Sequence, residues 1–143
     1  MHDIYLSETG FIKICDPTAA TSSPYEITSG YFYSPEILRS INGGTNEEVN
    51  IFKSDTFALG CCILELSLMK NIADIFSYED GLLDKNTLSK YIEEFRELGY
   101  SKEYTEFVEE TLILNFRSRP DFTMIKTRIF EMFNLTPGEH SLE

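Results

Sequence analysis

Short apolar runs separated by turn-forming residues fill the beginning of the chain. Residues 4–6 (Ile-Tyr-Leu) and 11–15 (Phe-Ile-Lys-Ile-Cys) flank Ser-Glu-Thr-Gly at 7–10. Two β-rich runs on either side of four turn formers predict a β-hairpin over residues 1–16. The Asp16-Pro17 step ends the second strand, because proline cannot donate a hydrogen bond to a β-ladder.

The pattern then changes to a loop followed by a short helix. Residues 17–33 show no hydrophobic period and are rich in Pro, Thr, Ala, Ser and Gly, which predicts a loop. Ser34, Pro35 and Glu36 have the order of a helix start: an N-cap, a first helical residue and an acid in the positive first turn. The residues expected to be buried in this helix are Ile37, Leu38 and Ile41.

The strongest helical signal covers residues 54–69. Apolar residues fall on nearly every face of this segment, interrupted only by Gly60, Glu65 and Ser67. A helix that is apolar all round, but shorter than a membrane span, is expected at the centre of a protein core. We expect Ser54 or Asp55 to cap its N-terminus.

Three amphipathic helical stripes follow. The first ends near Gly99, and the third begins with Pro120 at its first helical position and ends at Pro137-Gly138. Their apolar positions are Leu88, Tyr91, Ile92 and Phe95, then Tyr104, Phe107, Val108 and Leu112, then Phe122, Ile125, Ile129, Phe130 and Phe133. The pattern predicts one α+β domain over 1–143, mainly α, with a helical bundle at 34–136 around one buried helix.

The net charge of the chain disfavours some classes of binding partner. Twelve basic and 24 acidic residues give a net charge of −12. This balance disfavours nucleic acid as a partner, because such binding depends on neutralising phosphates, and it disfavours an anionic membrane surface. No apolar run reaches the length of a membrane span, so no membrane insertion is expected. Residues 79–110 carry half of the net charge, which we interpret as a solvated helical face rather than an acidic docking surface.

The cysteines favour a reducing compartment. Cys61 and Cys62 are adjacent, so no disulfide between them is expected, and both have the pattern of small core residues. The N-terminus lacks the features of a signal peptide, and we expect a cytoplasmic protein. With two histidines and no pair of CxxC motifs, a structural zinc site is not expected.

Five short segments match the motifs of one family in order and in spacing. They are 3–6 (Asp-Ile-Tyr-Leu), 12–18 (Ile-Lys-Ile-Cys-Asp-Pro-Thr), 34–36 (Ser-Pro-Glu), 53–60 (Lys-Ser-Asp-Thr-Phe-Ala-Leu-Gly) and 115–120 (Asn-Phe-Arg-Ser-Arg-Pro). In these segments the chain resembles the C-terminal lobe of a eukaryotic Ser/Thr-type protein kinase. The loop at 17–33 then stands for the family's activation segment. The resemblance implies a kinase C-lobe-like bundle.

Departures from the family concern its catalytic parts. The glycine-rich loop, the strand lysine and the His-Arg-Asp catalytic loop are not in this chain. Asp3 stands where the family has a metal-binding asparagine, and Pro17-Thr18 replaces the Phe-Gly that follows the metal-binding aspartate. Proline fixes φ and threonine lacks the freedom of glycine, so this loop cannot move as the family's does.

The resemblance singles out six residues. Asp3 and Asp16 imply a degenerate magnesium site, although each also fits an ordinary strand-end or turn aspartate. Ser29 stands in the substrate-docking loop, where a plain loop serine is the simpler explanation. Glu36 and Arg119 imply a buried ion pair, for which a planar guanidinium is well suited. Asp55 implies an anchor for the catalytic loop, or simply the N-cap of the central helix.

Two functions follow as hypotheses. We expect a non-catalytic kinase-like lobe that acts as a protein-interaction or structural subunit, has no cofactor of its own and has a protein partner over the N-terminal hairpin. The alternative is a C-terminal fragment of a protein kinase, which would use ATP and Mg²⁺ once complemented by an N-lobe. A phosphopeptide reader is disfavoured, because the chain has no cluster of basic residues.

Overall fold

The computed structural model describes residues 4–14, 32–43, 49–77 and 80–135. The chain divides into two compact units, Met1–Tyr31 and Phe32–Glu143. The fold is α+β and mainly helical, with a small N-terminal antiparallel hairpin, as the sequence predicts. No helix in the described ranges is long and apolar enough to cross a membrane.

The first unit contains the predicted hairpin. Strand β1 (Ile4–Leu6) pairs antiparallel with β2 (Ile12–Ile14), so that Leu6 lies opposite Ile12 and Tyr5 opposite Lys13. The turn is closed by hydrogen bonds between Ser7 and Phe11 and by Gly10 at φ 85°. The register places Leu6 and Ile12 on the same face of the hairpin, because residues opposite each other in a ladder project to the same side.

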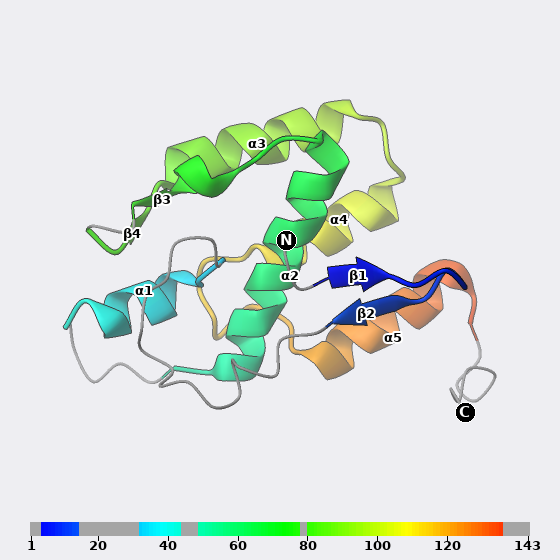
Figure 1. Ribbon diagram of the computed structural model, residues 1–143, viewed down its shortest axis with the longest axis horizontal. Coiled ribbons are helices and arrows are strands. Elements are labelled where there is room, and N and C mark those ends of the chain that lie inside the picture. The colour runs from blue at the N-terminus through cyan, green and yellow to red at the C-terminus, as the bar shows by residue number, and fades with distance from the viewer. Residues whose placement is uncertain (1–3, 15–31, 44–48, 78–79, 136–143) are drawn as a thin grey trace. The chain divides into compact units, whose positions relative to one another are not determined.

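The second unit is built around helix α2 (Ile51–Leu68), which contacts α3 (Lys85–Glu97), α4 (Lys102–Thr111) and α5 (Phe122–Phe133), as Figure 1 shows. The first helix, α1 (Pro35–Ile41), contacts the second strand of a small hairpin. That hairpin pairs β3 (Phe76–Ser77) with β4 (Leu82–Leu83) and follows a 3₁₀ turn, η1 (Ala73–Ile75). The sequence analysis predicted none of η1, β3 and β4.

One core joins these helices. Its buried apolar side chains come from α1, α2, η1, β3, α3, α4 and α5 together with the adjoining turns: Leu38, Phe57, Cys61, Leu64, Ile72, Ile75, Phe76, Leu88, Phe95, Phe107, Val108, Leu112 and Ile125. Helix α2 is central but is not enclosed on every side, because Ile51, Phe52 and Leu66 are exposed. The prediction of a helix buried all round therefore holds only for the side that carries Phe57, Cys61 and Leu64. On the rest of the same stretch Leu59, Cys62 and Ile63 are half-buried.

The observed helix ends differ from the predicted ones at three places. The N-cap of α2 is Asn50, whose side chain accepts from the Lys53 amide, so neither Ser54 nor Asp55 caps the helix. Pro120 precedes α5 rather than opening it, because Asp121 is the N-cap and accepts from the Met124 amide. Helix α5 ends at Asn134 with φ 51°, before the predicted stop at Pro137-Gly138.

The predicted short helix is present, with one difference. Ser34 occupies the N-cap position and Pro35 the first turn of α1, but the Ser34 hydroxyl does not cap the helix. It donates instead to the Ser54 hydroxyl of α2 at 2.9 Å. Of the residues expected to be buried, Leu38 is fully buried, whereas Ile37 and Ile41 are half-buried.

Candidate functional site

Arg119 lies at the junction of three segments of the helical unit. It follows the turn after α4, and hydrogen bonds from its amide to Asn115 and Phe116 carbonyls fix that turn. Its guanidinium donates to both carboxylate oxygens of Glu36, at 2.7 and 3.1 Å, and both side chains are fully buried. The ion pair implied by the resemblance is therefore present, and it connects α1 to a turn that lies 83 residues further along the chain.

The remaining donors of Arg119 are also used. Nη1 donates to the Lys53 carbonyl at 2.7 Å and Nε to the Ile113 carbonyl at 2.7 Å, and Nη2 reaches the Leu114 carbonyl at 3.4 Å. The guanidinium carbon lies 4.9 Å from the ring centre of Phe57. A buried charge is costly unless it is paired and fully hydrogen-bonded, and this one is. The junction is thus a rigid structural centre without a free group for chemistry.

The thiol beside this junction is buried. Cys61 is fully buried on α2, and burial raises the pKa of its thiol well above the usual value, although the nearby Arg119 charge acts in the opposite direction. Burial likewise raises the pKa of Cys62. Because the thiolate is the nucleophilic form, these shifts favour the less reactive thiol. Cys61 is a core residue, as its sequence pattern predicts, whereas Cys62 is half-buried.

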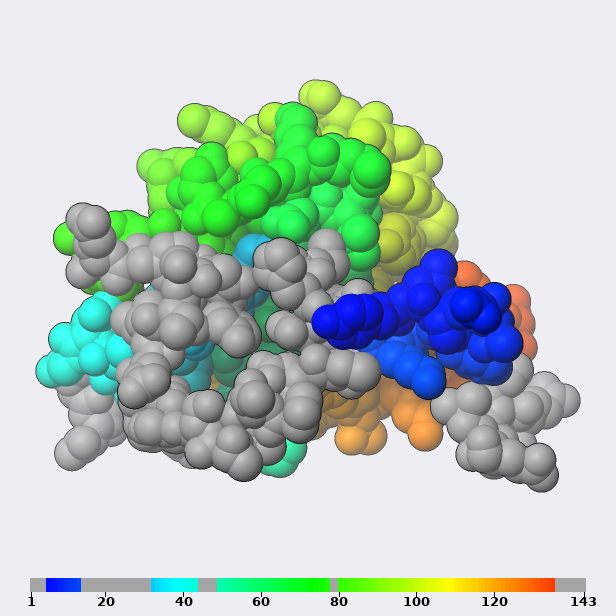
Figure 2. All heavy atoms as spheres, viewed as in Figure 1, coloured from blue at the N-terminus to red at the C-terminus, as the bar shows by residue number. Residues whose placement is uncertain are grey.

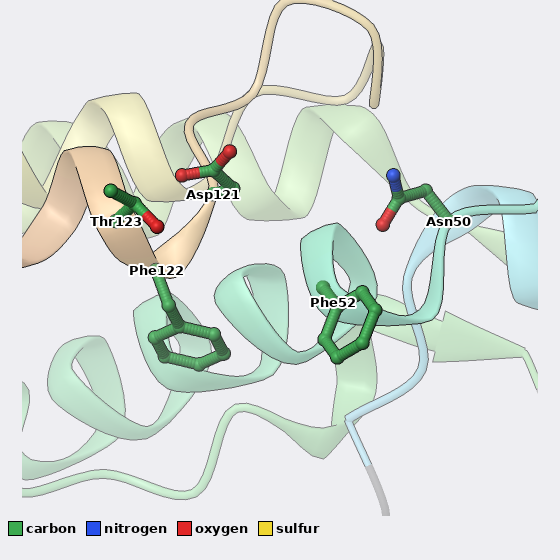
Figure 3. A pocket seen from close by; sticks show the side chains of 5 residues that line it. All are labelled: Asn50, Phe52, Asp121, Phe122 and Thr123. Carbon is green, nitrogen blue, oxygen red and sulfur yellow. The ribbon is translucent and has the colours of Figure 1, made fainter.

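A pocket of about 240 Å³ lies beside the junction, between the first turns of α2 and α5. Figure 3 shows the rings of Phe52 and Phe122 along one side, with Asp121 and Thr123 at one end and Asn50 at the other. Asn50 and Asp121 each accept a hydrogen bond from a backbone amide of their own helix. Two of its three polar side chains therefore already cap helices, and the pocket is an open recess with a mixed polar and apolar lining.

The other predicted site residues divide into two groups. Asp3, Asp16 and Ser29 lie outside the described residues, so the degenerate magnesium site and the docking-loop serine stay predictions. Asp55 is described and lies on the exposed side of α2, where partial desolvation raises the pKa of its carboxyl. Within the described ranges no group of three or more His, Cys, Asp or Glu side chains could hold a metal ion.

Two parts of the junction were missed by sequence analysis. The Lys53 carbonyl accepts from Arg119, and the Phe57 ring lies against the guanidinium, but neither contact has a sequence signature. Asn50 could have been identified as the cap of α2, because asparagine is a favoured N-cap and Ile51 begins the apolar run. The glycine-poor turn 113–119 gives no comparable signal.

A scan against protein-family models finds no matching family, and a search of curated proteins finds no significant match.

Proposed function

We propose that this chain is a non-catalytic, protein-kinase-like C-lobe that acts as a protein-interaction or structural subunit of a larger assembly. Two observations support the two halves of the proposal. The buried Glu36–Arg119 junction supports the kinase-like architecture, because the resemblance implies a carboxylate–guanidinium contact between these two positions. The exposed apolar hairpin supports the interaction role.

The hairpin carries the interaction role because its apolar side chains have little cover. Leu6 and Ile12, which lie opposite each other in the ladder, are 74% and 71% exposed. Tyr5 and Phe11 are also more than half exposed. A two-stranded hairpin is marginal by itself, and exposed apolar surface together with open strand edges favours a protein partner. We propose that this partner covers residues 1–18, with the 19–33 loop as a possible extension.

Hydrophobic-dye fluorescence and sedimentation of the purified chain test this role. We expect dye binding or concentration-dependent association, and both should fall in the double variant L6S/I12S. The matched control is Leu66→Ser, which removes an exposed leucine from α2. A monodisperse chain that binds no dye contradicts the proposal.

Absence of catalysis is the second testable part. Phosphotransfer requires a general base and phosphate-positioning groups within hydrogen-bond reach of the substrate, and the chain has no His-Arg-Asp loop or glycine-rich loop. We expect no transfer from radiolabelled ATP to a generic protein substrate. Transfer that disappears in Asp16→Ala would favour the alternative, a kinase fragment that uses ATP and Mg²⁺.

A cytoplasmic location is the compartment that we propose. Cys61 and Cys62 are free thiols in the described structure. Free buried thiols are typical of a reducing compartment. Detection of the chain in a secreted or oxidising compartment, with these thiols oxidised, would contradict the assignment.

A further inference from the structure

The corner between α3 and α4 exposes an aromatic and an aliphatic side chain. Every residue from 96 to 103 is exposed, and Leu98 and Tyr100 are 50% and 46% exposed. Tyr100 is nonetheless held in place, because its ring packs against Phe95 at 5.4 Å and edge-on against Tyr104 at 5.2 Å. In the space-filling view the yellow-green end of α3 lies at the outer edge of the helical unit (Figure 2). The corner therefore presents a fixed apolar platform.

The ion pairs around this platform leave it negatively charged. Arg96 is held by both carboxylate oxygens of Glu109, at 2.6 and 2.9 Å, and Lys102 pairs with Glu106 at 3.6 Å. Arg96 and Lys102 thus each pair with another acid, as does Arg128 with Glu110, although the charges of Lys102 and Arg128 also reach Glu103. Within the described part of the chain, Glu97 and Glu103, which flank Tyr100 by three residues on either side, have no ion-pair partner.

Glu97 also lies at the end of α3 that is electrostatically unfavourable for an acid. It is the last residue of α3, and the carbonyl groups at a helix C-terminus carry partial negative charge, which favours cations and disfavours acids. Glu103 lies in the first turn of α4, where an acid is favoured, and its own backbone amide and the Ser101 side chain lower the pKa of its carboxyl. A cation placed between the two carboxylates would be attracted by Glu97, Glu103 and the end of α3 together.

We propose that this corner is a docking surface for a basic segment of a partner protein. An arginine or lysine of the partner stacks on the exposed face of Tyr100, with its charge near Glu97 and Glu103, and a neighbouring apolar side chain covers Leu98. The acidic segment 79–110 then has a binding role beyond solvation, at least at this corner. This surface belongs to the helical unit, whereas the interface proposed above belongs to the hairpin unit.

Fluorescence anisotropy with short labelled peptides tests the surface on the intact chain. The first peptide alternates leucine and arginine, the second replaces each arginine by glutamate, and the third replaces each leucine by serine. We expect the first peptide to bind most tightly, the third more weakly and the second not at all. The affinity of the first peptide should fall as salt is raised from about 0.05 to 0.15 M, because exposed charges are then screened.

Matched variants locate the binding. Leu98→Ser and Glu97→Gln should each weaken the first peptide about fivefold, since each removes one contact of ordinary surface strength. The controls Leu66→Ser on α2 and Glu131→Gln on α5 make the same chemical changes at exposed positions elsewhere, and each should change the affinity less than about twofold.

Three outcomes would overturn the inference. One is that the first peptide does not bind. Another is that Glu97→Gln and Glu131→Gln weaken it equally, because the attraction would then come from the net charge of the whole chain. The third is an effect of L6S/I12S without an effect of Leu98→Ser, which would assign the binding to the hairpin instead. Dye binding by the hairpin is measured separately, so either proposal can fail without the other.

Discussion

The helical unit buries many of its apolar side chains, whereas the N-terminal hairpin leaves apolar side chains exposed. In the helical unit, side chains from five helices, η1 and β3 meet in one core, where Phe57, Leu64 and Phe95 are fully buried. In the hairpin, Leu6 and Ile12 are paired in the ladder yet remain mostly exposed. The difference teaches that backbone pairing alone does not bury a hydrophobic face. The helical unit covers its own apolar core, whereas the strand pairing of the hairpin leaves Leu6 and Ile12 exposed.

The buried ion pair should give the largest effect. Arg119→Ala leaves Glu36 charged and unpaired in the core, and we expect a loss of about 3–5 kcal/mol of unfolding free energy. Arg128→Ala is the control, because its pair with Glu110 is substantially exposed and should contribute less than about 1 kcal/mol. Denaturant unfolding of both variants checks the prediction. Equal losses would mean that the junction is not the structural centre described here.

A matched pair of leucines tests the contrast between the two units directly. Leu64→Ala removes a fully buried side chain from α2 and should cost about 2–5 kcal/mol. Leu6→Ala removes a mostly exposed side chain from β1 and should change stability by less than about 0.5 kcal/mol. Thermal unfolding of the two variants gives the comparison. A large loss from Leu6→Ala would show that the hairpin is part of the stable core.

Because α2 packs closely on α4, replacing Gly60 by alanine should have the opposite of its usual effect on helix stability. Alanine normally stabilises a helix interior relative to glycine, but a methyl group at Gly60 would collide with Thr111 and Leu112. Gly60→Ala should therefore destabilise the protein by about 1–3 kcal/mol. Adding Thr111→Ala should restore part of the loss, because it removes the nearest colliding atom. A stability gain from Gly60→Ala alone would refute the packing.

The smallest of these effects concerns the cap of α5. Asp121→Ala removes the acceptor of the Met124 amide and should cost about 1 kcal/mol. Asp121→Ser retains a capping hydroxyl and should recover most of that loss. Urea unfolding with both variants measures the difference. If the two substitutions are equivalent, Asp121 does not act as a cap, and the first turn of α5 is held by packing alone.

The hydrophobic periodicity and the turn-forming residues predicted most of the fold. The spacing of Leu88, Tyr91 and Phe95 placed α3, and the turn residues at 7–10 placed the hairpin, because these signals are local. Helix starts were less predictable, since Asn50 and Asp121 compete with neighbouring Ser54, Asp55 and Pro120, each of which is also a plausible start. Strands β3 and β4 have two residues each, too few for any alternation to be visible.

The candidate site was predictable only in part. The Glu36–Arg119 contact followed from the family resemblance, whereas the bonds from Arg119 to the Lys53 and Ile113 carbonyls depend on how distant segments meet. Backbone carbonyls have no residue signature, so no sequence pattern reports them. The exposure of Leu98 and Tyr100 was likewise invisible, because the type of an apolar residue does not say whether its side chain is buried.

Amide hydrogen exchange of the isolated chain tests the central contrast most directly. We expect amides 5–14 of the hairpin to exchange nearly as fast as those of an unstructured peptide, because a two-stranded sheet without a covered face opens readily. Amides 57–64 in the middle of α2 should exchange only on global unfolding, since their helix lies at the centre of the core. Protection of the hairpin equal to that of α2, in a monomer without a partner, would contradict the account.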